Sequence, residues 1–437
     1  MPMMSKFVIE GGRRLEGTIR ASGNKNAALA LLPACLLTDE PVILHNIPDI
    51  QDVRTTLGIL DDLGVDVQRL NESSWRIQAR NVRKTELDPS LAGRIRASFV
   101  FSGPMLARAG RITLPIPGGD VIGGRPLDTH VQGLRALGAT IDLDEQRGVF
   151  HISAESLRAA GRLLQAEASV TGTENTIMAA VFASGETIIE NAASEPHVRD
   201  LCNFLNQLGA IIEGTGTNRL VIQGVEALHG GEFTIGADFM EVGSFVGAAA
   251  VTGGCVRIEQ ASPDDLRMIG LVYERLGVTW EVDGDDIVVP EGQPMAIEGA
   301  LGGRIPEIKP MPWPGFPPDL MSIAVVIGTQ ARGAVLLHDW MYESRFFFVD
   351  KLKFMGGRVV LCDPHRVLVH GPCSLYANPH GVTSPDIRAG MAMILAALCA
   401  RGTSTIHNIQ QVDRGYEHVE EKLQALGARI ERVADRD

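Results

Sequence analysis

At 437 residues the chain is too long for one hydrophobic core, so we expect at least two domains. Hydrophobic residues make up 45% of the sequence and charged residues 21%, which is typical of a globular protein in water. The net charge of −13 argues against a broad surface for nucleic acid or anionic membranes. An anionic ligand must therefore be held by a local cluster of cations.

The termini and cysteines give little sign of export or of a metal. The first ten residues lack the apolar run of a signal peptide, and the longest apolar run, 391–400, is too short to span a bilayer. The six cysteines are scattered, with no Cys-x-x-Cys pair and no histidine at ligand spacing. We therefore predict buried thiols in the reducing cytoplasm and no zinc site.

A motif that ends in glycine recurs six times, at intervals of roughly 70 residues. It is Leu-Gly-Ala or Leu-Gly-Val in five copies and Met-Gly-Gly in the other. A glycine just past a helix end usually caps that helix in the left-handed conformation. The recurrence therefore predicts six copies of one structural unit, with these glycines at the caps: Gly64, Gly138, Gly209, Gly277, Gly356 and Gly427.

Each unit is predicted to contain an Ala-rich helix, a strand, a second helix that ends at the shared glycine, and short alternating strands. The Ala-rich helices 26–37 and 390–400 are apolar on nearly all sides, which predicts burial. The fold class is therefore α/β, with helices packed inside against sheets. The other predicted elements are helices 174–183 and 243–252; strands 41–44, 186–189, 255–258 and 403–406; and second helices 52–63, 197–208, 265–276 and 415–426.

The domain boundaries follow from this repeat. We expect three units in each domain. The last unit lacks closing strands, and the N-terminal segments 6–9 and 17–20 are expected to supply them, so that the first residues belong to the C-terminal domain. That domain would contain residues 1–24 and 237–437. The other domain would contain residues 25–236, including the glycine-rich segment 114–126.

The segment 114–126 places four glycines around Asp120 and closes with Arg125. Glycine loses more backbone entropy on ordering than other residues, so this loop is costly to fix in one conformation. One interpretation is a surface turn with an incidental acid. The other is a catalytic lid with an acid at its tip and a guanidinium at its hinge.

Five cations are predicted at the starts of helices, where they oppose the helix dipole: Lys25, Arg96, Arg345, Arg388 and Arg414. Singly, each is explained by a surface salt bridge. Together they favour helix N-termini that converge on one anionic ligand such as phosphate. Asp319 follows five prolines in 310–318 and is either a plain N-cap or a base for a substrate hydroxyl.

The motifs resemble those of the enolpyruvyl transferases, in their UDP-N-acetylglucosamine branch, over essentially the whole chain. They are Ser22-Gly-Asn-Lys-Asn-Ala-Ala, Ile95-Arg-Ala-Ser, Pro117-Gly-Gly-Asp-Val-Ile-Gly-Gly-Arg-Pro-Leu-Asp, Phe316-Pro-Pro-Asp, Asp386-Ile-Arg-Ala and Asp413-Arg-Gly-Tyr-Glu. The resemblance implies two inside-out α/β barrel domains with pseudo-threefold symmetry. It also implies transfer of enolpyruvate from phosphoenolpyruvate to the 3′-hydroxyl of UDP-N-acetylglucosamine, with release of phosphate, as the first committed step of peptidoglycan synthesis.

The resemblance also implies residue roles. Lys25, Arg125 and Arg414 would hold phosphoenolpyruvate, with help from Arg388. Asp120 would protonate its C3 methylene, and Asp319 would deprotonate the attacking hydroxyl. No metal or organic cofactor is implied, and the partners are the two small-molecule substrates. The residues expected to hold the nucleotide sugar are Asn26, Arg96, Arg125, Pro126, Leu127, Asp128, Thr129, Ser169, Val170, Asp319 and Met341.

The chain departs from the family pattern at three positions. Asp120 stands where a cysteine is usual, and fosfomycin acts on the family by alkylating that cysteine. Glu167 and Phe239 stand where some relatives have lysine and arginine, respectively.

Two other functions stay open: transfer to another acceptor, such as shikimate 3-phosphate or a different nucleotide, and binding of nucleotide sugars without catalysis.

Overall fold

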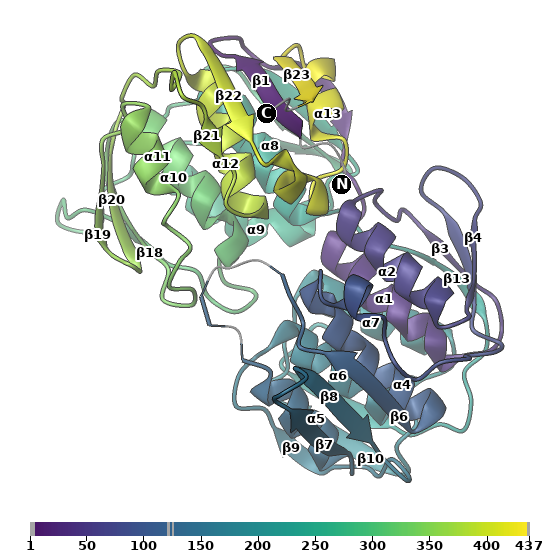
Figure 1. The fold of residues 1–437 in the computed structure, drawn as a ribbon. Helices are drawn as coiled ribbons and strands as arrows, with labels where there is room; N and C mark the ends of the chain where they lie inside the picture. The colour runs from purple at the N-terminus through teal and green to yellow at the C-terminus, as the bar shows by residue number, and fades with distance from the viewer. Residues whose placement is uncertain (1–4, 120–122, 125, 435–437) are drawn as a thin grey trace. The chain divides into compact units, whose positions relative to one another are not determined.

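The computed structural model describes residues 5–119, 123–124 and 126–434, which divide into two compact units (Figure 1). Unit 1 contains 5–22, 123–124 and 237–434 of the described chain, and unit 2 contains 23–119 and 126–236. The chain leaves unit 1 after Ser22, two residues before the expected boundary, and returns after Gly236. In the described chain, no helix is long and apolar enough to span a bilayer.

Three buried helices form the centre of unit 1: α8 (Phe239–Thr252), α10 (Met321–Gln330) and α12 (Ile387–Cys399). Each of the three contacts the other two. Beyond their first turns they carry no charged residue, so they present no face suited to water. This arrangement confirms the predicted burial of segment 390–400.

Strands and shorter helices surround this centre (Figure 1). The three sheets have the strand orders β15-β16-β14-β2, β17-β18-β20-β19 and β21-β22-β1-β23. The shorter helices are α9 (Arg267–Arg275), α11 (Val349–Phe354) and α13 (Val419–Ala425), with 3₁₀ turns η3 (Pro263–Leu266), η4 (Pro318–Leu320) and η5 (Ile409–Arg414). The strands are β1 (Ser5–Glu10), β2 (Glu16–Arg20), β14 (Cys255–Glu259), β15 (Glu281–Asp283), β16 (Asp286–Val289), β17 (Glu307–Ile308), β18 (Gly333–His338), β19 (Val359–Asp363), β20 (Arg366–Gly371), β21 (Val382–Thr383), β22 (Thr403–His407) and β23 (Arg429–Ala434).

The N-terminal strands belong to unit 1, as the sequence predicted. β1 lies between β22 and β23 and is antiparallel to both, so that Ile9 faces Ser404 on one side and Ile430 on the other. The prediction that segment 17–20 also closes the last unit was wrong. β2 runs parallel to β14, in the sheet that follows α8. The two segments therefore complete two different sheets of the unit.

Unit 2 repeats the plan around α1 (Lys25–Ala34), α4 (Ser102–Ala109) and α6 (Val170–Ala180). Its other helices are α2 (Gln51–Asp62), α3 (Pro89–Ala92), α5 (Asp128–Ala136) and α7 (Pro196–Gln207), with η1 (Cys35–Leu37) and η2 (Arg96–Phe101). The sheet orders are β13-β3-β5-β4, β6-β8-β7 and β11-β12-β10-β9. The strands are β3 (Val42–His45), β4 (Asp66–Arg69), β5 (Trp75–Gln78), β6 (Arg111–Pro115), β7 (Thr140–Asp144), β8 (Val149–Ser153), β9 (Gly161–Leu164), β10 (Glu186–Glu190), β11 (Ile211–Glu213), β12 (Arg219–Gln223) and β13 (Gly231–Thr234).

The six shared glycines confirm the repeat. Each follows a helix and has a positive φ, between 78° for Gly277 and 103° for Gly209. An L-residue adopts this conformation only at a steric cost, which explains why glycine recurs there. The predicted α/β class is confirmed as well, because both units combine helices with sheets that contain parallel and antiparallel strand pairs.

The cysteine prediction was wrong in part. Cys35, Cys202 and Cys373 are buried, and burial raises the pKa of Cys202 to about 12. Cys255 and Cys362, however, are exposed at strands β14 and β19.

The close packing of the unit 1 helices gives a testable stability prediction. A Cβ at Gly247 of α8 would lie 2.7 Å from Cγ2 of Ile323 and 3.2 Å from Cδ2 of Leu395. Overpacking of a filled core typically costs about 1–3 kcal/mol, so Gly247→Ala should lower the urea midpoint of unfolding. Gly58→Ala in α2 is the matched control, because its Cβ meets only Leu91 Cδ1 at 3.8 Å. Equal midpoints for the two variants would contradict the prediction.

Candidate active site

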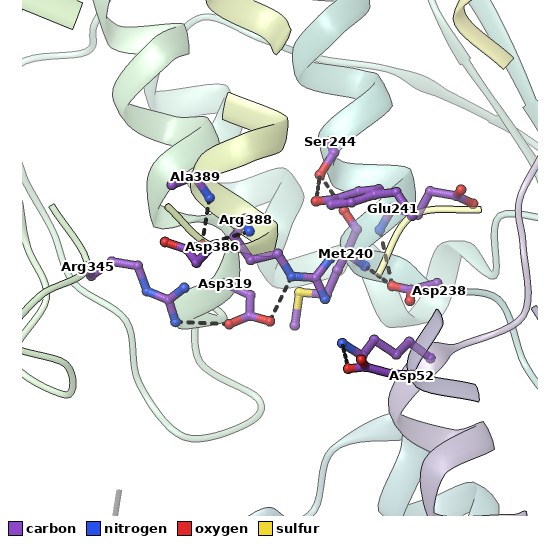
Figure 2. Close-up of polar contacts among 12 residues, drawn as sticks. Asp52, Asp238, Met240, Glu241, Ser244, Asp319, Arg345, Asp386, Arg388 and Ala389 are labelled. Atoms are coloured by element: carbon purple, nitrogen blue, oxygen red, sulfur yellow. Dashed lines mark hydrogen bonds and ion pairs between the residues drawn. The ribbon is translucent and has the colours of Figure 1, made fainter. Parts of the chain in front are cut away.

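Asp319 lies between two arginines in unit 1 (Figure 2). Its Oδ1 is 3.0 Å from Nη2 of Arg345, and its Oδ2 is 2.9 Å from Nε of Arg388. Asp319 sits in the short turn η4, immediately before α10, and its side chain is 29% exposed. A carboxylate that is ion-paired yet still reached by solvent can meet a substrate, which a fully enclosed one cannot.

The alternative that Asp319 is a plain N-cap is not supported. The N-cap of η4 is Pro317 and that of α10 is Leu320, and neither makes a side-chain capping bond. The carboxylate is oriented by the two guanidinium groups instead.

Arg388 is a buried cation in the first turn of α12, as expected. Asp386 caps this helix by accepting hydrogen bonds from the backbone N–H of Arg388, at 2.8 Å, and of Ala389, at 2.9 Å. The Arg388 guanidinium lies 5.1 Å from the centre of the Tyr416 ring. Burial alone would lower the pKa of Arg388, but the Tyr416 hydroxyl and Asp319 outweigh it and raise that pKa.

One nitrogen of Arg388 fits an anionic ligand. Nη1 is buried and has no hydrogen-bond partner among the described residues, although the side chain is only 5% exposed. Leaving a charged donor unpaired inside a protein is costly, so such a group points to a bound acceptor.

Arg345 is also buried, but it is not at a helix start as predicted. It lies in the turns before α11, which begins only at Val349. Its Nε is 3.6 Å from Oδ2 of the buried Asp339. Burial alone would lower the pKa of Arg345, but three nearby carboxylates, led by Asp319, outweigh it and raise that pKa.

Asp339 connects Arg345 to the backbone of Met341. Its Oδ1 accepts hydrogen bonds from the backbone N–H of Met341, at 2.9 Å, and of Tyr342, at 3.1 Å. Burial raises the pKa of Asp339 despite the nearby Arg345. Met341, a predicted nucleotide-sugar residue, is therefore fixed by the carboxylate that also faces Arg345.

Arg414 is placed differently from the prediction. It is the last residue of η5, not the first of a helix, and its Nη1 donates to Oε1 of Gln411 at 2.9 Å. Tyr416, two residues later, lies beneath Arg388. The structure therefore brings the Arg414 segment, Arg388 and Asp319 together in unit 1.

Lys25 opens α1 in unit 2, as expected. Asn24 caps the helix by accepting from the backbone N–H of Ala27 at 3.0 Å, and Asn26 follows in the first turn. The Lys25 ammonium is 2.9 Å from Oδ2 of Asp52, which lies in the first turn of α2. Both side chains are more than nine-tenths buried.

The remaining predicted residues gather on η2, α5 and α6 of unit 2. Nη2 of Arg96 donates to the carbonyl oxygen of Pro126 at 3.3 Å. Leu127 and Asp128 line an open pocket of about 400 Å³ at the start of α5. Ser169 caps α6 by accepting from the backbone N–H of Gly172 at 3.3 Å, and Val170 begins that helix.

His130, which follows the buried Thr129, ties these elements together. Asn175 Nδ2 lies 3.0 Å from Nδ1 of His130, and Oγ1 of Thr171 lies 3.0 Å from Nε2. An amide nitrogen can only donate, so Nδ1 accepts and Nε2 carries the proton. Burial, together with Arg96, lowers the pKa of His130 to about 3, so the ring is neutral.

Two predicted residues, Asp120 and Arg125, lie outside the described residues. Some supporting residues were not predicted from the sequence. Asp52, Asp339, His130 and Asn175 were not singled out, and Arg345 was not assigned to the substrates. Asp52 could have been found from the sequence, because an acidic residue in the first turn of a predicted helix is a recognisable signal. The others carry no local sequence signal, because their partners are far away in the chain.

The whole chain is similar to known carboxyvinyltransferases. Residues 9–423 match the EPSP synthase (3-phosphoshikimate 1-carboxyvinyltransferase) family. The UDP-N-acetylglucosamine 1-carboxyvinyltransferase of Borreliella burgdorferi is 52% identical over 98% of this chain and 99% of its own. The protein of that name from Treponema denticola is 50% identical, with the same coverage of both chains.

Solved structures share the fold. The enolpyruvyl transferase NikO from Streptomyces tendae matches with a TM-score of 0.87, at 24% identity and 100% coverage of both chains. EPSP synthase from Acinetobacter baumannii matches with a TM-score of 0.73 at 18% identity, over 98% of this chain and 100% of that one. The chain therefore belongs to the EPSP synthase family and, within it, to the UDP-N-acetylglucosamine 1-carboxyvinyltransferases.

Proposed function

We propose that the protein transfers the enolpyruvyl group of phosphoenolpyruvate to the 3′-hydroxyl of UDP-N-acetylglucosamine and releases phosphate. The observation that carries this proposal is sequence identity. Over nearly its full length, the chain is identical at about half of its positions to proteins named for that activity. The buried Arg388 supports it, because its Nε pairs with Asp319 and its Nη1 has no hydrogen-bond partner within the described part of the chain. The product commits the sugar to peptidoglycan, and the proposed site of the reaction is the cytoplasm.

The proposed roles keep the assignments made from the family motifs. Lys25, Arg125, Arg388 and Arg414 hold the phosphate and carboxylate of phosphoenolpyruvate. Asp319 binds the 3′-hydroxyl. The nucleotide sugar is held by Asn26, Arg96, Arg125, Pro126, Leu127, Asp128, Thr129, Ser169, Val170, Asp319 and Met341. Each domain is proposed to be an inside-out α/β barrel with pseudo-threefold symmetry.

The reaction proceeds by addition and elimination. Asp120 gives a proton to C3 of phosphoenolpyruvate, which leaves positive charge at C2. The 3′-oxygen attacks C2 while Asp319 takes the hydroxyl proton, giving a tetrahedral ketal. The C3 proton then returns to Asp120 as the bond between C2 and the phosphate oxygen breaks, and the departing phosphate takes the proton held by Asp319. Cations around the phosphate stabilise the leaving group.

Phosphate release from phosphoenolpyruvate tests the proposal. We expect release with UDP-N-acetylglucosamine, and little release without an acceptor or with shikimate 3-phosphate. Release with shikimate 3-phosphate instead would identify the other branch of the family. Binding of UDP-N-acetylglucosamine without any release would favour a non-catalytic nucleotide-sugar-binding protein.

Asp120 predicts resistance to fosfomycin. Alkylation by the drug's epoxide requires a strong nucleophile on the protein, and a thiolate opens the epoxide far faster than a carboxylate. We expect the wild type to keep its activity during incubation with the drug, and an Asp120→Cys variant to be active but inactivated with time. Rapid irreversible inactivation of the wild type would show that Asp120 is not the lid acid.

A further inference from the structure

Tyr416 is a buried residue of unit 1, and the roles assigned from the family motifs do not include it. It follows Arg414 by two residues, and its side chain is only 2% exposed. Its backbone N–H donates to the carbonyl oxygen of Val412 at 3.0 Å, which fixes the start of the side chain. A buried tyrosine hydroxyl usually has a hydrogen-bond partner, so its contacts show how the ring is held.

Helix α8 holds the hydroxyl of Tyr416. That hydroxyl lies 2.9 Å from Oγ of Ser244, and Ser244 donates its own proton to the carbonyl oxygen of Met240 at 2.7 Å (Figure 2). A serine hydroxyl has one proton to donate, so Ser244 accepts the proton of Tyr416. The tyrosine is therefore fixed at both ends, by its own backbone and by α8.

The guanidinium of Arg388 lies over this fixed ring. Its carbon is 5.1 Å from the ring centre, within the range of a cation–π contact, and Arg388 is itself buried. Arg388 also meets Asp319 along one edge, where Nε is 2.9 Å from Oδ2. A guanidinium that is bound along one edge can still tilt about that edge. An aromatic ring against its flat face opposes the tilt, because the planar group stacks on the ring.

Neither contact occupies Nη1 of Arg388 with an acceptor, and this nitrogen has no hydrogen-bond partner within the described ranges. We propose that Tyr416 is a positioning residue for Arg388: its ring fixes the plane of the guanidinium, so that Nη1 is presented to phosphoenolpyruvate. This inference rests on the proposed function, in which Arg388 helps to hold phosphoenolpyruvate. Tyr416 itself does not touch the substrate.

The test is Tyr416→Met, assayed by phosphate release. Methionine fills the space with a flexible apolar chain but offers no ring face. A charge-assisted hydrogen bond is worth about tenfold to a hundredfold in affinity, so a misdirected Nη1 should raise KM for phosphoenolpyruvate by about that factor. KM for UDP-N-acetylglucosamine should stay within about threefold of the wild type, less than the effect of one ordinary hydrogen bond.

The conservative variant Tyr416→Phe keeps the ring and removes only the hydroxyl. Phenylalanine still offers a face to the cation, so KM for phosphoenolpyruvate should stay within about threefold of the wild type. A variant that only loosened the core would not be rescued in this way.

Tyr273→Met is the matched control. Tyr273 of α9 is also fully buried, and its hydroxyl is also held by α8, because it donates to the carbonyl oxygen of Gly243 at 3.1 Å. Its ring lies near Trp280, with the two ring centres 6.4 Å apart. Both methionine variants should therefore unfold at lower urea concentrations than the wild type, whereas only Tyr416→Met should raise KM for phosphoenolpyruvate.

The inference is overturned if Tyr416→Met keeps a normal KM for phosphoenolpyruvate, or if both of its KM values rise together. It is also overturned if Tyr416→Phe raises that KM as much as Tyr416→Met does, since the hydroxyl would then be responsible. If Tyr416→Met does not fold, Tyr416→Leu replaces it. Failure of both to fold, while Tyr273→Met folds, would leave Tyr416 with a structural role alone. Failure of the proposed function would appear differently, as absence of phosphate release by the wild type.

Discussion

Asp319→Asn should lower kcat by about 10²–10⁴-fold, the usual contribution of a general base. The amide has nearly the same shape as the carboxylate but cannot accept the proton of the 3′-hydroxyl. The geometry adds a second reason, because Asp319 orients both Arg345 and Arg388. The measurement is phosphate release at saturating concentrations of both substrates, with binding of each substrate followed by calorimetry.

The same change should also lower the melting temperature. Two buried guanidinium groups would lose a shared negative partner, although Asp339 still faces Arg345. Asp363→Asn is the control, since Asp363 pairs with the half-exposed Arg366 at the surface. A variant that melts earlier yet releases phosphate at the wild-type rate would leave Asp319 with a structural role alone.

Lys25→Met is expected to abolish turnover, because the donor phosphate loses the cation at the start of α1. It should also destabilise the protein, since the buried Asp52 would lose the ammonium at 2.9 Å. Removing one partner of a buried ion pair typically costs about 3–5 kcal/mol. An inactive Lys25→Met variant would therefore not by itself prove a role in catalysis.

Combining Lys25→Met with Asp52→Asn resolves that ambiguity. The double variant removes both charges of this ion pair, so its melting temperature should recover most of the loss. Turnover should not recover, because the cation is still missing. If activity returned together with stability, Lys25 would serve only to neutralise Asp52.

Much of the fold could be predicted because it is encoded locally. The capping glycines, such as Gly64 and Gly209, recur at a constant interval, and the Ala-rich helices have no polar face. The position of β1 in the last sheet was predicted correctly from segment 6–9. The destination of β2 was not, because its partner β14 lies more than 200 residues away and many strands share its alternating pattern.

The candidate site was predictable only in part. Family motifs indicated Asp319, Arg388 and Lys25, but the ion pairs that orient them join distant segments. Arg345 and Arg414 were wrongly placed at helix starts, since nearby acids and a glycine imitate a helix boundary. The neutral state of His130 depends on burial beside Arg96, which no local pattern shows.

Because β1 pairs with β22 and β23, unit 1 cannot close its last sheet until the ribosome has added more than 400 residues. Unit 2 lies between these partners in the chain and is complete once Gly236 has emerged. Domains generally fold as units during synthesis. Unit 2 should therefore become compact before the strands that pair with β1 and β2 have been synthesised. A chain halted after Gly236 would therefore carry Phe7 and Ile9, fully buried in the finished protein, on a tail with no sheet to join.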